Sequence, residues 1–293
     1  MDTSETKKSL DPKISIISPF FNSESTLKRA VDSVISQSFS EWELILVNDG
    51  SSDQSERIAK SYLEDQRISY IYQENKGVSA ARNLGASKAK ADWLIFLDSD
   101  DTFLADSIKN FFFYIGRFND NTDIVFSSYY LIKNGKLELY ASSRLAGSYC
   151  IKKYIFFEIG GFDEKMTYGE NSELIRRAKL KGLKFQKANF VSLKYFESKN
   201  GGSKNLLNMI QSNEYLLKKY SDFFECRQYE KAVYLQVIGV ALLRLGEFEK
   251  AQKYFLECVK IRFLKPQYWF RLFLSSFPFL SRKIYPLKRS IQF

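Results

Sequence analysis

The stretch Trp93-Leu94-Ile95-Phe96-Leu97-Asp98-Ser99-Asp100-Asp101 joins an apolar run of strand length to three carboxylates. Acidic side chains at the point where a buried strand reaches the surface add nothing to packing. Carboxylate oxygens are, however, the ligands that ions such as Mg²⁺ prefer. The stretch therefore predicts a site that holds a divalent metal ion against an anionic group such as a diphosphate. The alternative is a solvated, Asp-rich turn that binds nothing.

The chain before this stretch alternates between strand and helix patterns. Apolar runs of strand length occur at 14–19, 42–47 and 68–73, with helical patterns from about Ser23, Asp53 and Gly77 between them. The order βαβαβαβ predicts an α/β fold with a mostly parallel, Rossmann-like sheet and helices on both faces. Ligands of such sheets bind outside the carboxyl ends of the strands. Four polar segments should therefore meet at one rim: 19–22, 48–53, 75–77 and 98–101.

The pattern changes after the acidic stretch. A helix is expected at 105–118, and Asn134-Gly135 predicts a hairpin between strands at 123–132 and 136–140. A short helix at 153–159, a turn at 160–164, a helix at 172–181 and a strand at 184–196 should follow. Residues 197–204 have the composition of a linker, and the chain after them has a helical pattern.

The composition excludes several kinds of site. The 293 residues include no histidine, which rules out Ser-His or Cys-His catalysis and histidine-bound zinc. Cys150, Cys226 and Cys258 are odd in number and far apart, which indicates reduced thiols in a cytoplasmic protein. Residues 1–13 are polar and lack the apolar core of a secretory signal, so we expect a disordered N-terminal segment there.

Six short motifs follow one another along the first two thirds of the chain. They are Pro19-Phe20-Phe21-Asn22, Ser33 to Phe39, Val47 to Asp53, Asn75 to Gly85, Phe96 to Asp101 and Gly160 to Glu164. In this order they resemble the motifs of the bacterial family 2 glycosyltransferases, a large inverting group with a GT-A fold. The resemblance covers about residues 14–188 and implies a GT-A catalytic domain over residues 14–200.

The resemblance also implies roles for individual residues. Asp49 should accept a hydrogen bond from the imide of a uracil-like base, Arg82 should bind the base or the diphosphate, and Asp98 should lie near the ribose. Asp100 should ligate Mg²⁺ or Mn²⁺. The residues assigned to the nucleotide sugar are Pro19, Phe21, Asn22, Glu24, Asp49, Lys76, Gly77, Arg82, Asp98 and Ser99. The alternatives are a surface helix cation for Arg82 and a turn residue for Asp49.

The expected catalytic base departs from the family pattern. The family usually carries Glu-Asp after its Gly-Phe-Asp segment, and the second acid deprotonates the acceptor hydroxyl. Here the pair is Glu170-Asn171, and an asparagine cannot take a proton at neutral pH. The candidate catalytic positions are therefore Glu170, Asn171 and Glu173. The alternative for Glu170 is an acid that only stabilises the start of a helix.

The C-terminal part separates into two regions of different character. Residues 205–264 resemble a tetratricopeptide unit, and we expect a helical hairpin because one such unit cannot bury its own face. From Lys260 onward there are eight basic and no acidic residues, so the net charge of +10 leaves +2 for the rest of the chain. The tail, residues 265–293, mixes these cations with aromatic residues and suits lying in an anionic membrane surface. Its uncharged run at 272–281 is too short to span a bilayer.

The function that follows from the resemblance is metal-dependent, inverting transfer of a sugar from a nucleotide sugar, with UDP as the expected nucleotide. The expected acceptor is a hydroxyl of a saccharide or lipid-linked acceptor in cell-surface polysaccharide synthesis, at the inner face of the cytoplasmic membrane. We expect no nucleic-acid partner. Two alternatives remain open: a catalytically weak nucleotide-sugar-binding protein, and a phosphatase of the haloacid dehalogenase type. Asp98 to Thr102 fits the latter's Asp-x-Asp-x-Thr signature, but that signature belongs on the leading strand.

Overall fold

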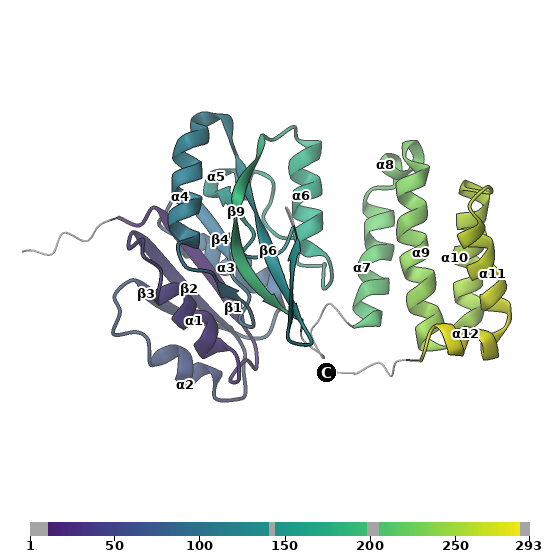
Figure 1. Ribbon diagram of the computed structural model, residues 1–293, viewed down its shortest axis with the longest axis horizontal. Coiled ribbons are helices and arrows are strands. Elements are labelled where there is room, and N and C mark those ends of the chain that lie inside the picture. The colour runs from purple at the N-terminus through teal and green to yellow at the C-terminus, as the bar shows by residue number, and fades with distance from the viewer. Residues whose placement is uncertain (1–10, 141–143, 198–204, 288–293) are drawn as a thin grey trace, which may run out of the picture. The chain divides into compact units, whose positions relative to one another are not determined.

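The computed structural model describes residues 11–140, 144–197 and 205–287, and the chain divides into two compact units (Figure 1). The first comprises residues 1–164 and 170–198, and the second comprises residues 165–169 and 199–293. Most of the N-terminal segment and of the predicted linker lies outside the described residues.

The first unit is built on one mixed sheet of nine strands, counted over its described residues. Its order is β3-β2-β1-β4-β8-β6-β9-β5, and β7 pairs with the outer part of β6. The strands are β1 Ile14–Phe20, β2 Trp42–Asp49, β3 Ile68–Gln73, β4 Trp93–Phe96, β5 Thr102–Phe103, β6 Ile124–Lys133, β7 Lys136–Tyr140, β8 Tyr149–Lys152 and β9 Phe185–Phe196. Strands β3, β2, β1 and β4 are parallel, as predicted, whereas β8 is antiparallel to both of its neighbours.

Helices cover both faces of this sheet, which confirms the predicted α/β class. They are α1 Leu27–Ile35, α2 Ser55–Lys60, α3 Val78–Lys88, α4 Ser107–Phe118, α5 Lys153–Glu158 and α6 Glu170–Leu180. Successive strand residues point to opposite faces: Leu44 and Leu46 of β2 join one core with α1 and α4, and Ile45 and Val47 join the other with α3, α5 and α6.

Close contact between α3 and the sheet depends on a glycine within the predicted motif. A Cβ atom on Gly85 would lie 2.5 Å from Cγ2 of Ile17 and 3.0 Å from Cγ2 of Val47. Only a residue without a side chain lets α3 approach β1 and β2 so closely. This packing places the start of α3 beside the ends of those strands.

Several local predictions are confirmed, and two strands were missed, β5 and β8. The hairpin between β6 and β7 turns at Asn134 and Gly135, both with positive φ. The helix expected from Asp53 to about Asp65 is shorter, because α2 ends at Lys60. The two-residue strand β5 was not predicted, since so short an element carries no periodicity; it pairs with Lys194 and Leu193 of β9.

The second unit contains helices throughout its described residues. They are α7 Leu206–Lys219, α8 Ser221–Cys226, α9 Gln228–Leu245, α10 Phe248–Ile261, α11 Pro266–Ser276 and α12 Pro278–Ile284. Residues 205–264, where a helical hairpin was expected, contain four helices, α7 to α10. Of these, α9 and α10 form a hairpin that turns at Gly246 in the left-handed region, and they meet where Gly239 faces Phe255. No helix in the described ranges is long and apolar enough to cross a membrane.

The basic aromatic tail forms part of this unit. Helix α11 packs on α10, and its Tyr268 and Leu274 are buried. Other aromatic residues of the tail stay exposed: Trp269, Phe270, Phe273, Phe277 and Phe279. The described part of the tail, residues 265–287, is therefore amphipathic, with one face in the helical core and one aromatic face toward solvent.

Candidate functional site

The polar segments at the carboxyl ends of β1 and β2 are joined by hydrogen bonds. Asn22, with φ of 46°, donates its N–H to Oγ of Ser51 and accepts from the N–H of Ser52 through Oδ1. Ser23 links the same loop to residues 98–101, called the acidic turn below, because its Oγ lies 2.8 Å from Oγ of Ser99. The rim predicted from the order of strands is therefore present in the structure.

Glu24 and Phe21 both follow β1 at this rim, but Glu24 makes hydrogen bonds whereas Phe21 is exposed. The Glu24 carboxylate accepts a hydrogen bond from the N–H of Gln54, and its own N–H donates to Asp53. Glu24 therefore fastens the first loop to the second. Phe21 is exposed and directly follows β1, in which Pro19 is buried.

Asp49 is buried and caps the start of α3. Its Oδ1 accepts from Nε2 of Gln73 at 2.6 Å and from the N–H of Lys76 at 2.9 Å, while Oδ2 accepts from the N–H of Gly77 at 2.9 Å. The carboxylate thus lies at the positive end of the helix dipole. Because a carboxylate offers about four acceptor positions, these bonds leave one position on Oδ2. Asp49 combines the structural role of a turn residue with room for one more donor.

The acidic turn contains three carboxylates in three different environments. Asp98 is about one-third exposed and is paired with Arg82. Asp101 is 1% exposed, and its Oδ1 accepts from the N–H of Phe196. Burial, followed by the charges of Asp100 and Asp98, raises the pKa of Asp101 well above its usual value.

Asp100 is the member of this turn that suits a cation. Burial and the neighbouring charge of Asp98 raise the pKa of Asp100 to about 6. Among the described residues, no hydrogen bond or ion pair to the Asp100 side chain is found. Asp100 is partly buried, and a partly buried carboxylate next to a second acid favours a positive partner. Oxygen donors suit Mg²⁺ or Mn²⁺. No group of three or more acidic or cysteine side chains with metal-binding geometry occurs in the described ranges. A metal ion here would therefore also need oxygens from a bound molecule such as a diphosphate.

The acidic turn is also held from α1 and β9, by residues that the sequence did not indicate. Arg29 donates from Nη2 to the carbonyl oxygen of Asp100 at 2.5 Å, and its guanidinium lies 3.7 Å from the centre of the Phe196 ring. The backbone of Phe196 holds Asp101, as described above. Arg29 points outward from its helix, so helical periodicity gives no signal for this contact.

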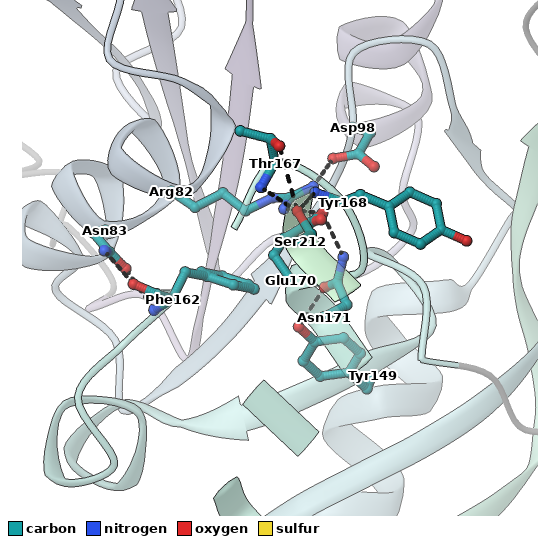
Figure 2. A network of polar contacts seen from close by, with 10 residues as sticks. All are labelled: Arg82, Asn83, Asp98, Tyr149, Phe162, Thr167, Tyr168, Glu170, Asn171 and Ser212. Carbon is teal, nitrogen blue, oxygen red and sulfur yellow. Dashed lines mark hydrogen bonds and ion pairs between the residues drawn. The ribbon is translucent and has the colours of Figure 1, made fainter. Parts of the chain in front are cut away.

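Arg82 lies in the interior and bridges two acids (Figure 2). Its Nη2 donates to Asp98 at 2.5 Å and its Nη1 donates to Oε1 of Glu170 at 2.9 Å. Burial alone would lower the pKa of Arg82, but the charges of Asp98 and Glu170 outweigh burial and raise it. The guanidinium also faces the Phe162 ring at 5.1 Å. Arg82 is therefore no surface cation, and two of its nitrogens are already committed to carboxylates.

Glu170 and Asn171 begin α6 and continue this network (Figure 2). Nδ2 of Asn171 donates to Oε1 of Glu170 at 3.1 Å, and the hydroxyl of Tyr149 donates to Oδ1 of Asn171 at 2.8 Å. Tyr149 comes from β8 and is fully buried. Tyr149 belongs to none of the six motifs, so sequence reasoning did not select it as a site residue.

Glu173, the third candidate base, lies in a different setting. Its side chain is fully buried, and both oxygens accept hydrogen bonds from Arg177 at 2.7–2.9 Å. Arg177 in turn donates to the carbonyl oxygens of Ile159 and Gly161. Glu173 therefore helps to fix the Gly160 to Glu164 turn against α6.

That turn is also fixed to α3 by a reciprocal pair. Nδ2 of Asn83 donates to the carbonyl oxygen of Phe162 at 2.9 Å, and the N–H of Phe162 donates to Oδ1 of Asn83 at 2.8 Å. Gly161 has φ of 63°, and a Cβ there would lie 2.8 Å from Oδ1 of Asn83. The two motifs that contain Asn83 and Gly161 are thus joined through these contacts.

Residues 165–169, just before α6, group with the helical unit. Within that unit the N–H groups of Thr167 and Tyr168 donate to Oγ of Ser212 in α7, at 3.2 and 3.1 Å (Figure 2). Ser212 is buried, so these bonds anchor the segment to α7.

Comparison with known proteins agrees with these observations. The family model described as Glycosyl transferase family 2 matches residues 15–186. Glycosyltransferase GlyA of Streptococcus pneumoniae is 40% identical over 122 residues, which are 41% of this chain and 17% of that protein. An uncharacterized glycosyltransferase of Rickettsia prowazekii is 30% identical over 184 residues, which are 56% of this chain and 57% of that protein. The chain thus spans less than two thirds of the length of these relatives.

Solved structures share the fold at low sequence identity. Staphylococcus aureus TarS, residues 1–349, aligns with a TM-score of 0.59 and 15% identity, covering 92% of this chain and 91% of that one. The same fragment in complex with UDP-GlcNAc gives a TM-score of 0.61 at 14% identity, covering 92% of each chain. At such identity the likeness establishes the arrangement of elements alone.

Proposed function

The chain belongs to glycosyl transferase family 2 and has its GT-A fold, and on that premise we propose that it is an inverting glycosyltransferase that uses a UDP-sugar. The observation that carries the proposal is the rim, where Asp49, Asp98 and Asp100 lie at the carboxyl ends of β2 and β4. This is where ligands of such sheets bind. The proposed reaction is attack of an acceptor hydroxyl on the anomeric carbon, from the face opposite the departing UDP.

The free acceptor position of Asp49 supports a uracil base. An imide N–H can donate to Oδ2, whereas cytosine presents an acceptor at the same ring position. Pro19, Phe21 and Asn22, at the end of the neighbouring strand β1, are the residues proposed to border the base. Lys76 and Gly77 are held to Asp49 through their N–H groups. TarS has been crystallised with UDP-GlcNAc and with UDP, which supports the same nucleotide here.

Asp100 is the proposed ligand of Mg²⁺ or Mn²⁺, with Asp98 and Ser99 beside it at the nucleotide. A divalent ion there would neutralise the charge that develops on the departing diphosphate. The chain's own part is to hold the Asp100 carboxylate in place: Arg29 donates to the backbone carbonyl of Asp100, and the N–H of Phe196 donates to the neighbouring Asp101. Arg82 holds Asp98 from the interior, and its predicted role at the base or the diphosphate stays part of this proposal.

Glu170 is the proposed base that accepts the proton of the acceptor hydroxyl. It is the partly exposed acid at the start of α6, with a side chain that is 15% exposed, while Glu173 is enclosed by Arg177. A positioned base contributes about 10²–10⁴-fold in rate. Asn171 favours the second candidate, a nucleotide-sugar-binding protein of weak activity, because it stands where the family usually has the base.

A thermal-shift and calorimetric screen tests the proposal. The full chain is titrated with UDP, CDP, GDP and UDP-sugars, with and without Mn²⁺, beside the variant Asp100→Ala. We expect UDP to bind tightly only when Mn²⁺ is present, because the ion needs oxygens from both the Asp100 carboxylate and the diphosphate. Asp100→Ala should remove the increase in UDP affinity that Mn²⁺ causes. Release of UDP from a UDP-sugar then separates an enzyme from a binding protein. Equal binding of CDP, or full activity in excess chelator, would contradict the proposal.

The proposed acceptor is a saccharide or lipid-linked hydroxyl in cell-surface polysaccharide synthesis. The exposed aromatic face of α11 and α12 supports a place at the inner face of the cytoplasmic membrane. Trp269, Phe270 and Phe273 are exposed there, and the Lys283 ammonium lies 4.6 Å from the centre of the Phe279 ring. Aromatic and basic side chains on one face suit an anionic lipid surface.

A further inference from the structure

Glu170 is held through one carboxylate oxygen. Oε1 accepts from Nη1 of Arg82 at 2.9 Å and from Nδ2 of Asn171 at 3.1 Å. No hydrogen bond to Oε2 is found among the residues that the structure describes. The Glu170 side chain is partly exposed, whereas Arg82 and Asn171 are buried. The two oxygens of Glu170 therefore differ: one is fixed by the protein and one is available.

The orientation of Asn171 follows from its neighbours. A carboxylate only accepts hydrogen bonds, so the side of Asn171 that faces Glu170 must be the NH₂ group. Oδ1 then faces Tyr149, and the tyrosine hydroxyl, which could donate or accept elsewhere, must donate here. An aspartate at position 171 would lose the donor to Glu170 and place a second negative charge about 3 Å from it.

We propose that Tyr149 and Asn171 are positioning residues that orient Glu170 through Oε1, so that Oε2 receives the proton of the acceptor hydroxyl. The inference rests on the proposed function of Glu170 as the base. In the step, the acceptor O–H bond breaks as its oxygen bonds to the anomeric carbon, the bond from that carbon to UDP breaks, and the proton passes to Oε2. Tyr149 and Asn171 touch neither substrate and act only through Glu170.

This arrangement assigns a role to Asn171, which stands where the family usually has the catalytic base. In a chain where residue 171 carries the base, Glu170 would be the neighbour that supports it. Here the order is reversed, because the amide can donate to Glu170 and cannot take a proton. Arg82, which also holds Asp98, then joins the proposed base to the acidic turn.

A double-mutant cycle on UDP release from a UDP-sugar, with water as the acceptor, tests the inference. Tyr149→Phe should lower kcat about five- to tenfold, as expected for one lost hydrogen bond, with KM for the donor unchanged. In the Glu170→Gln background the same substitution should have no further effect, because residues that act as a unit are not additive. Tyr62→Phe is the matched control, since its hydroxyl donates to Asp32 at 2.7 Å, away from this network. An equal loss from Tyr149→Phe in both backgrounds would overturn the inference.

The variant Asn171→Asp distinguishes Glu170 from residue 171 as the base. We expect it to lower kcat below that of the unchanged chain. A raised kcat would show that residue 171 itself takes the proton and would overturn the inference.

A readout that needs no turnover follows the ¹⁵N-labelled side-chain amide of Asn171, assigned by its loss in Asn171→Asp. Its resonance should move in Tyr149→Phe and in Glu170→Gln and should stay unchanged in Tyr62→Phe. A resonance insensitive to Glu170→Gln would overturn the inference. Failure of the proposed function is separate, because it would appear as absent binding of UDP-sugars while this coupling is still measured.

Discussion

Arg82 and Asp98 form an ion pair in which the cation is buried and the acid is about one-third exposed. The guanidinium also pairs with Glu170, so one cation from α3 serves an acid after β4 and an acid at the start of α6. A buried charge is tolerated only when it is paired. The three residues therefore form one electrostatic unit, with exposure increasing from Arg82 to Glu170 to Asp98.

Removing Arg82 should destabilise the chain strongly. Arg82→Met leaves Glu170 and Asp98 without their cation, and breaking a buried pair costs about 3–5 kcal/mol. Urea unfolding measures the loss. Arg57→Met is the control, because Arg57 is exposed on α2 and should change stability by about 0.5 kcal/mol at most. A loss below about 1 kcal/mol for Arg82→Met would mean that water, not Arg82, balances these acids.

Metal-dependent UDP binding should weaken as the pH falls through about 6. With the pKa of Asp100 raised to about 6, the carboxylate is ionised above that pH and protonated below it. A proton then competes with Mn²⁺ for the same oxygen. Calorimetry between pH 5 and 7.5 should show the Mn²⁺-dependent part of UDP affinity falling at the acid end. Asp100→Ala should lack this dependence, and a flat affinity in the unchanged chain would contradict it.

The interface between α9 and α10 should not tolerate a methyl group at Gly239. A Cβ there would lie 2.7 Å from the ring of Phe255, and overpacking costs about 1–3 kcal/mol. Gly116→Ala in α4 is the matched control, since nothing lies within 4 Å of its Cβ. We expect Gly239→Ala to lower the unfolding midpoint and Gly116→Ala to leave it equal or higher. A midpoint unchanged by Gly239→Ala would show that Phe255 moves aside freely.

Membrane attachment should depend on the exposed face of α11. Because Tyr268 and Leu274 are buried, deleting the tail would damage the helical core, and the sharper change is Trp269→Ser with Phe270→Ser and Phe273→Ser. This variant should fold and bind UDP but sediment less with anionic liposomes, since the rings supply apolar transfer energy. The control replaces Leu137 and Leu139, two exposed residues of β7, by serine. Equal liposome binding by both variants would rule out this face.

The rim could be predicted because chain order and strand direction determine it. Four parallel strands in succession bring residues such as Asn22, Asp49 and Asp100 to one edge, although they are far apart in sequence. Strand boundaries within this part agree with the sequence to within a few residues, because each strand is a continuous apolar run.

Partners inside the site could not be predicted. Arg82 meets Glu170 across 88 residues, and Tyr149 meets Asn171 only because β8 inserts antiparallel between β4 and β6. Neither contact produces a periodic pattern or a local motif in the sequence from which it could be predicted. The tail was a similar case: its composition indicated an amphipathic segment, but Tyr268 and Leu274 could be assigned to a core only once α10 and α11 were placed together.

The contact of Asp101 with Phe196 has a consequence for synthesis of the protein. The acidic turn and the strand that fastens it are 95 residues apart, which a ribosome translates in roughly 5–20 s. During that interval the nascent chain already carries the turn but lacks the ring beneath Arg29 and the N–H that holds Asp101. The proposed nucleotide-sugar site is therefore among the last parts of the first unit to take shape, and a chain released before β9 would carry the acidic motif without a fixed place for it.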